Sequence, residues 1–126
     1  MAILFFDTEM SDMVRRDQAP GPRQPHIVQL AALFVEHDSE RSMCTLVRPE
    51  GWTISPGAER VHGISTEQAA ANGVPIREAV GAFHDLAVRA DTFVAHNIEF
   101  DLVMMLSEYA RLGSRTRSLA SHSSAP

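Results

Sequence analysis

The sequence predicts a single α/β domain built around a mixed β-sheet. Its 126 residues fit one domain, and a 44% hydrophobic content can form a substantial core. The predicted elements follow the order strand, hairpin pair, helices, strand and helix, which is typical of a sheet with both parallel and antiparallel neighbours. These observations favour a compact enzyme-like fold over an all-helical or all-β one.

Four segments have the pattern of strands. Residues 3–6 form a continuous apolar run, which indicates a strand buried on both faces. Residues 27–35 and 43–47 predict a hairpin, because the polar segment 37–41 between them is short. Residues 92–95 predict a fourth, short strand.

Three segments have the pattern of helices. Ser65 followed by Gln68 resembles a capping box and predicts a short helix. Apolar residues at helical spacing predict a longer helix over residues 76–90. Asn97 is a suitable N-cap for a last helix that ends near Leu112.

The remaining segments are predicted to be irregular. Residues 10–25 are polar and rich in arginine, proline and glycine, so we expect a mobile loop. Residues 49–56 form a second loop. Residues 114–126 contain several serines and no acidic residue, and we expect a disordered tail. The predicted domain therefore spans residues 1–113.

Composition excludes several classes of protein. A net charge of −5 argues against a nucleic-acid binder that works through a broad basic patch, although bound metal ions could supply positive charge locally. The single cysteine, Cys44, cannot form an internal disulfide, is expected to be buried, and fits a cytoplasmic protein. The N-terminal residues lack the basic region of a signal peptide. No apolar run reaches the ~20 residues of a membrane span, so no membrane association is expected.

Asp7 and Glu9 follow the first predicted strand. Residues two apart on a strand share a face, so both carboxylates are expected to converge at the edge of the sheet. Like charges placed so closely need a proton or a cation between them, and a divalent metal ion is the simplest solution. The alternative is that the pair simply begins a polar loop.

Asp101 is expected to face inward from the last helix. It lies three residues after Ile98 and four before Met105, on or beside the apolar stripe of that helix. An inward carboxylate needs a partner. The alternative is a favourable charge at the helix N-terminus, a role that Glu99 fills equally well.

Three segments together resemble the DEDD-type exonucleases. Residues 5–9, Phe-Phe-Asp-Thr-Glu, resemble the first motif, and residues 94–101, Val-Ala-His-Asn-Ile-Glu-Phe-Asp, resemble the second. Residues 61–64, Val-His-Gly-Ile, resemble a segment found in relatives of the proofreading subunit of bacterial DNA polymerase III. The resemblance covers residues 1 to about 112, and it implies a ribonuclease-H-like fold that removes nucleotides from a 3′ end.

The same resemblance implies a cofactor, a site and partners. Two Mg²⁺ or Mn²⁺ ions would be held by the catalytic and metal-binding carboxylates Asp7, Glu9 and Asp101. The implied substrate is a single-stranded or frayed 3′ end of DNA or RNA, and a DNA polymerase is a further candidate partner. The implied substrate-binding residues are Thr8, Met10, His62, Ile64, Asn97 and Phe100.

The sequence departs from the family in two places. Met10-Ser11-Asp12 stands where the family often has Thr-Thr-Gly, and the third motif, with its histidine or tyrosine general base and fourth aspartate, is absent. We therefore expect the last strand and helix of the fold to be missing and the chain to be a poor nuclease. We also expect an open sheet edge and an uncovered apolar face on the last helix, around Leu102, Leu106 and Tyr109.

Three other interpretations remain open. The chain could be a catalytically inactive nucleic-acid or polymerase-binding module of the same fold. It could be a phosphatase of the haloacid dehalogenase type, although Glu9 and Ser11 replace residues which that motif needs. It could also be an α/β domain with no site, which leaves three matched segments unexplained.

Overall fold

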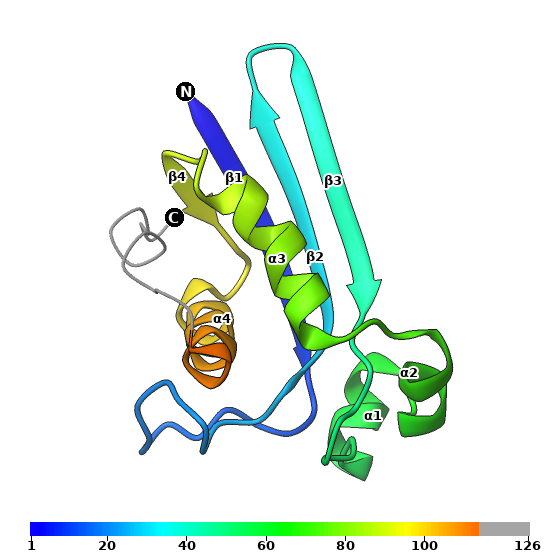
Figure 1. Ribbon diagram of the computed structural model, residues 1–126. Helices are drawn as coiled ribbons and strands as arrows, with labels where there is room; N and C mark the ends of the chain where they lie inside the picture. Colours follow the sequence, from blue (N-terminus) through cyan, green and yellow to red (C-terminus); the bar gives the residue numbers. More distant parts are fainter. Residues whose placement is uncertain (114–126) are drawn as a thin grey trace.

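A computed structural model describes residues 1–113 of the chain, and the predicted tail of residues 114–126 lies outside the described residues (Figure 1). Strands and helices alternate much as the sequence predicts. The elements are β1 (Ala2–Met10), β2 (Ile27–Glu36), β3 (Ser39–Leu46), α1 (Pro56–His62), α2 (Thr66–Asn72), α3 (Ile76–Ala87), β4 (Thr92–Val94) and α4 (Ile98–Leu112).

The described strands form one four-stranded sheet in the order β3-β2-β1-β4. β1 is antiparallel to β2 and parallel to β4, which confirms the predicted mixed sheet. β4 pairs with only a short part of β1, ending at Phe5 opposite Val94. The C-terminal half of β1 therefore lies beyond the end of β4, and no strand among residues 1–113 pairs with that edge there.

The hairpin is longer than predicted. β3 begins at Ser39, directly after a tight turn in which His37 has φ 53°. The early residues of β3 are exposed, so they lack the apolar alternation by which a strand is recognised in sequence. Cys44 is also exposed rather than buried, because it lies on the face of the sheet that no described helix covers.

One face of the sheet carries the main core. Leu4 and Phe6 of β1 and Phe34 of β2 are buried beneath α3 and α4. The ring of Phe6 meets Phe83 of α3 edge-on, with 5.4 Å between ring centroids. Figure 1 shows α3 crossing this face, with α4 beside it.

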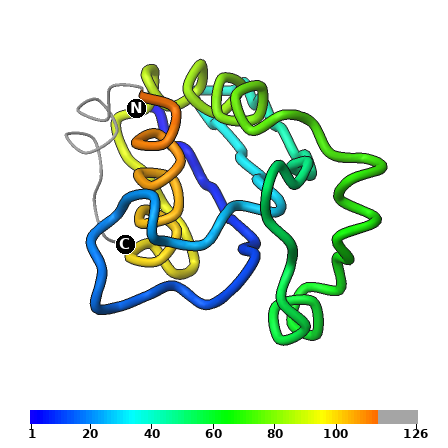
Figure 2. The backbone as a smooth tube through the Cα atoms, turned by 60° about the horizontal axis from the view of Figure 1, so that its bottom comes forward, coloured from blue at the N-terminus to red at the C-terminus, as the bar shows by residue number. Residues whose placement is uncertain are grey.

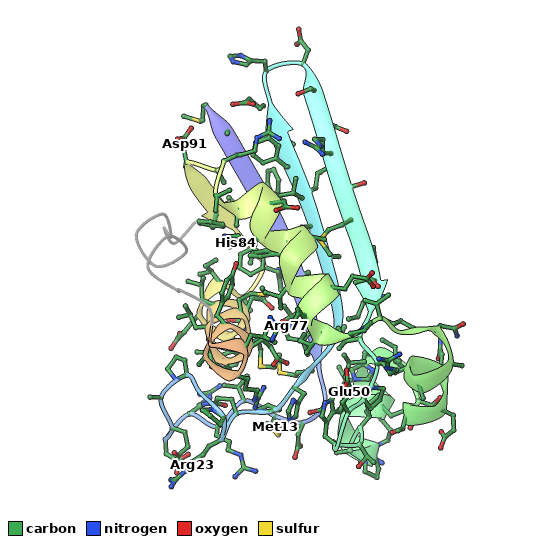
Figure 3. The ribbon with its side chains drawn as sticks, viewed as in Figure 1. Met13, Arg23, Glu50, Arg77, His84 and Asp91 are labelled. Carbon is green, nitrogen blue, oxygen red and sulfur yellow. The ribbon has the colours of Figure 1, made fainter. Side chains whose placement is uncertain are left out.

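The opposite face of the sheet is open in the described part of the chain. Alternation along β1 places Phe5 there, and its side chain is 40% exposed. The prediction that Tyr109 is exposed on α4 was wrong. Its side chain is buried, and its hydroxyl is hydrogen-bonded to Nδ1 of His84 at 2.7 Å. Figure 3 shows His84 on the side of α3 that faces α4. Leu102 and Leu106 also pack against the core, because α3 lies alongside the helix.

Sequence patterns missed helix α1. Ser55 caps it by accepting a 3.1 Å hydrogen bond from the backbone N–H of Ala58, and Pro56 follows in the first turn. Gly63 ends it with φ 75°, a conformation that favours glycine. No buried residue lies in this helix, so it lacks the apolar stripe by which helices are predicted. None of the described helices combines the length and apolar content needed to cross a bilayer.

The predicted irregular loop connects β1 to β2 and passes close to α4 (Figure 2). It is tied down rather than free. Ser107 of α4 accepts a 2.9 Å hydrogen bond from the backbone N–H of Gly21, and Arg111 donates to the carbonyls of Pro22, Gln24 and Pro25. The loop therefore has a defined position against the helix.

Candidate metal and nucleic-acid site

Asp7 and Glu9 lie within β1 near its C-terminal end, and not after it as the sequence suggested. They alternate with Thr8, so both are on the open face of the sheet while Thr8 is buried on the helix-covered face. The pairing register with β2 shifts between Glu9 and Met10. Such irregularities redirect side chains and terminate pairing next to functional sites.

Asp101 reaches the same part of β1 from the first turn of α4. Its side chain is buried, with 3% of the residue exposed. Its Oδ1 accepts hydrogen bonds from the backbone N–H of Thr8, at 3.2 Å, and from the Thr8 hydroxyl, at 2.7 Å. β4 ends opposite Phe5, so the backbone N–H of Thr8 lies beyond the paired part of β1 and donates to this carboxylate instead of to β4. The inward orientation predicted for Asp101 is what the structure shows.

The three carboxylates influence one another electrostatically. Burial raises the pKa of Glu9, and the negative charges of Asp7 and Asp101 raise it further, while His62 lowers it. Burial also raises the pKa of Asp101, the hydroxyl bond from Thr8 lowers it, and Asp7 raises it. No salt bridge among residues 1–113 includes any of the three. A cation at this place would relieve both the repulsion and the cost of burial.

The donor set suits a hard divalent cation, because Mg²⁺ and Mn²⁺ prefer oxygen ligands. Asp7, Glu9 and Asp101 would supply only carboxylate oxygens. Within the described residues, however, no three acidic, histidine or cysteine side chains are already placed to hold one ion. The site therefore has the chemistry of a metal centre without a ready-made coordination shell.

His62 links α1 to the end of β1. Its Nδ1 accepts a hydrogen bond from the backbone N–H of Ile64, at 3.1 Å. Nε2 lies 3.1 Å from the carbonyl oxygen of Met10 and must donate to it. Both ring nitrogens are thus engaged in positioning the backbone, and His62 orients Met10 beside Glu9.

An apolar pocket of about 540 Å³ lies between the end of β1 and α1. Glu9, Met10 and His62 line it together with Met13 and Val61. Met13 and Val61 are large apolar residues that are 82% and 84% exposed. Figure 3 marks Met13 on the loop that leaves β1. The pocket is therefore an open apolar surface directly beside a candidate metal ligand.

Ile64 does not line this pocket. It is buried in a second, smaller core with Val28, Ile54 and Ala69. Ile64 was expected to bind substrate, but it is 6% exposed, and Val61 instead offers exposed apolar surface to this pocket. Val61 precedes His62 in the Val-His-Gly-Ile segment of residues 61–64, but the sequence alone does not indicate which apolar residue of that segment is exposed.

Asn97 and Phe100 lie beside a second pocket of about 360 Å³, which Arg15 and Arg16 also line. Asn97 occupies the N-cap position of α4, but its side chain makes no capping hydrogen bond, contrary to the simplest expectation. The guanidinium of Arg16 lies 5.0 Å from the centre of the Phe100 ring. These two predicted substrate residues thus belong to a different pocket from Met10 and His62.

Glu108 is a second buried carboxylate on α4, and its burial was not predicted. Its Oε2 accepts a 2.9 Å hydrogen bond from the backbone N–H of Ile27, and its Oε1 lies 3.1 Å from Arg111. Glu108 follows Asp101 by two helical turns and therefore shares its face. That spacing was the available signal, and the pairing with Arg111 marks the residue as structural.

Comparison with known proteins identifies the family. The RNase_T exonuclease family model matches residues 4–122, which is most of the chain. The chain therefore belongs to this exonuclease family and carries a DEDD-type exonuclease domain of ribonuclease-H-like fold. Members of the family use divalent metal ions. No curated protein sequence matches at a significant level.

Several solved structures of exonuclease I share the fold. Escherichia coli exonuclease I in complex with a 5cy-dA13 oligonucleotide is 19% identical, with a TM-score of 0.78, over 99% of this chain and 27% of that one. The zinc-bound E. coli complex with single-stranded DNA gives the same identity, TM-score and coverage. Exonuclease I from Methylocaldum szegediense is 18% identical, with a TM-score of 0.66, over 82% of this chain and 22% of that one. The chain thus spans about a quarter of the length of these proteins, and none of them is the polymerase III proofreading subunit.

Proposed function

We propose that this chain is a metal-dependent 3′–5′ exonuclease that removes nucleotides from the 3′ end of DNA or RNA. The observation that carries the proposal is the position of Asp101. A residue distant in sequence brings a buried carboxylate to the β1 segment that holds Asp7 and Glu9. No described cation balances these charges, which is the arrangement that a metal-dependent hydrolase needs before its ions bind.

Asp7, Glu9 and Asp101 would hold two Mg²⁺ or Mn²⁺ ions. When bound, such ions activate water and stabilise the departing 3′ oxygen. Thr8 keeps the Asp101 carboxylate in a fixed orientation through its hydroxyl and its backbone N–H. The site would still gain ligands from water or substrate, since Mg²⁺ commonly retains several waters.

The apolar pocket would receive the 3′-terminal nucleoside. Met13 and Val61 offer exposed apolar surface for a base, and Glu9 lines the same pocket. Bases bind sequence-independently when they stack on such surfaces. Several of the matched exonuclease I structures hold single-stranded DNA or an oligonucleotide, and we extend that substrate class to this chain. A DNA polymerase partner and a cytoplasmic location remain predictions.

The second candidate function is a nucleic-acid-binding module of the same fold that does not cut. Two observations favour it. The described residues contain no ready-made three-ligand metal group, and His62 has both ring nitrogens engaged, so it is not available as a general base. The two candidates share a substrate and differ only in hydrolysis.

Hydrolysis of a 5′-labelled single-stranded oligonucleotide tests the proposal. In Mn²⁺, the full chain should shorten the strand from its 3′ end, and Asp7→Asn or Asp101→Asn should remove this activity. Asp38→Asn, an exposed substitution in the β2–β3 turn, is the matched control and should leave it unchanged. Binding without any shortening would favour the non-cutting module, and shortening that survives Asp7→Asn would rule out the proposed site.

A further inference from the structure

The pocket beside the N-terminal end of α4 is a basic feature in an acidic protein. The chain carries a net charge of −5, yet Arg15 and Arg16 both line this pocket from the β1–β2 loop, and Arg15 also lines a neighbouring pocket with Arg23. Neither arginine takes part in any salt bridge among the described residues. Two guanidinium groups without carboxylate partners can therefore interact with an external anion.

The ring of Phe100 orients one of these groups. The guanidinium carbon of Arg16 lies 5.0 Å from the ring centre, a cation–π contact that restrains a long side chain. A guanidinium presents a planar set of donors that matches phosphate oxygens in two-point contacts. Asn97 lines the same pocket with an exposed side-chain amide, and this amide makes no helix-capping hydrogen bond.

The loop that carries the arginines is held in place from inside. Gln24 is buried, accepts a 2.8 Å hydrogen bond from the backbone N–H of Arg15, and donates to the carbonyls of Arg15 and Gln18. Arg111 of α4 donates to the carbonyls of Pro22, Gln24 and Pro25 in the same loop. The loop is thus ordered before any ligand arrives, which lowers the entropic cost of binding.

The pocket and the candidate metal site share the first turn of α4. Phe100 lines the pocket, and the next residue, Asp101, is the buried carboxylate that meets β1. An anion held by Arg15 and Arg16 would lie beside the first turn of α4, which carries Asp101, and in a different pocket from the apolar one of Met13 and Val61. This layout fits a strand that extends past the site.

We propose that Arg15 and Arg16 bind a phosphate of the single strand, on the 5′ side of the nucleotide that is removed. This inference rests on the proposed function and deepens it, by naming the contact that retains the remaining strand. Glu99 also lines the pocket and opposes the anion, so it weakens the contact that the arginines make.

Fluorescence anisotropy with a 5′-labelled oligothymidylate, in EDTA to prevent hydrolysis, tests the contact. Arg16→Gln and Arg15→Gln should each weaken binding several-fold and should reduce the dependence of log K on log salt by about 0.7 per lost phosphate contact. Arg23→Gln is the matched control. It lies in the same loop and removes the same charge, but it does not line this pocket. Figure 3 shows Arg23 at the outer end of the loop.

Two further variants separate specific contact from general charge. Phe100→Leu keeps every charge and should still weaken binding, because the Arg16 guanidinium loses its support. Glu99→Gln should tighten it. Competition with inorganic phosphate shows whether a free anion occupies the site as well as the strand does, and we expect millimolar phosphate to compete poorly with the oligonucleotide.

The proposal is overturned if Arg15→Gln and Arg16→Gln weaken binding no more than Arg23→Gln does, or if the wild-type chain does not bind the strand. A Mn²⁺ melting curve on the same preparations separates this failure from failure of the proposed function. Loss of the arginine effect with an intact Mn²⁺-induced rise in melting temperature overturns only the phosphate contact. Absence of that rise counts against the metal site itself.

Discussion

Helix α4 carries two buried carboxylates whose surroundings differ in one respect. Asp101 and Glu108 share a helix face and are 3% and 2% exposed, and each accepts a backbone N–H from a neighbouring strand. Glu108 also lies 3.1 Å from Arg111. The charged neighbours that influence Asp101 are carboxylates, with Asp7 raising its pKa.

The difference teaches how a buried charge is used in this fold. Burial raises the pKa of Glu108, and the N–H of Ile27 and the Arg111 guanidinium offset only part of this rise. At Asp101, burial and the negative charge of Asp7 raise the pKa, and the hydrogen bonds from Thr8 lower it. Glu108 therefore has a cationic partner in the folded chain, whereas Asp101 leaves a local excess of negative charge that a bound metal ion would neutralise.

Glu108→Ala should have the largest effect on stability. Removing one partner of a buried pair leaves Arg111 uncompensated and the N–H of Ile27 without its acceptor, which costs about 3–5 kcal/mol of unfolding free energy. Urea denaturation measures this. Glu99→Ala, an exposed acid in the first turn of the same helix, should cost no more than about 1 kcal/mol. Equal losses in the two variants would contradict the distinction.

Divalent metal should stabilise the wild-type chain by acting at Asp101 and not at Glu108. At Mn²⁺ concentrations about a hundredfold above the dissociation constant, mass action adds about 2.7 kcal/mol to the unfolding free energy. Asp101→Asn should remove most of this gain. Glu108→Gln should lower stability yet retain the gain. Melting curves in Mn²⁺ and in EDTA measure both, and a gain that persists in Asp101→Asn would place the metal elsewhere.

Thr8→Val should have an intermediate effect. The substitution keeps the size of the side chain but removes the 2.7 Å hydroxyl bond to Asp101, and a bond to a charged acceptor contributes about 2 kcal/mol. Thr45→Val is the matched control, because the Thr45 hydroxyl donates to the neutral carbonyl of Leu46 and its loss should cost about 1 kcal/mol or less. Chemical denaturation in EDTA compares the two. Equal losses would mean that the charge on Asp101 adds nothing to the bond.

The smallest effect on stability should come from His26. Its ring stacks on Trp52, and its Nδ1 lies 4.0 Å from Oε2 of Glu108. Burial, and then the Arg111 charge, lower the pKa of His26 from 6.5 to about 4. The unfolded chain therefore binds more protons than the folded one between these values, and stability contributed by neutral His26 is lost as pH falls from 6.5 towards 4.

His26→Gln should flatten this part of the stability profile by no more than about 1 kcal/mol, because the side chain is partly solvated. Urea midpoints taken across that pH interval measure the slope. His37→Gln, in the exposed β2–β3 turn, should leave it unchanged. A profile that is equally steep in His26→Gln would assign the pH dependence to other groups.

Local patterns in the sequence predicted most of the fold. Strands β1, β2 and β4 and helices α2, α3 and α4 carry apolar runs, apolar periodicity or capping residues, and all are present. Helix α1 and the first half of β3 were missed because their residues face solvent and show no apolar repeat. The loop of residues 10–25 looked mobile because its anchors, Ser107 and Arg111, belong to a distant helix.

The sequence by itself determined the order of elements and predicted Asp7, Glu9 and Asp101 as candidate metal ligands, because short motifs and periodicity record local geometry. Only the tertiary structure decided which side chains are accessible and which charges are balanced. Ile64 is buried while Val61 is exposed, and Glu108 has Arg111 while Asp101 has Thr8. The reason is that burial and charge pairing depend on contacts between residues far apart in the chain, which a local pattern does not encode.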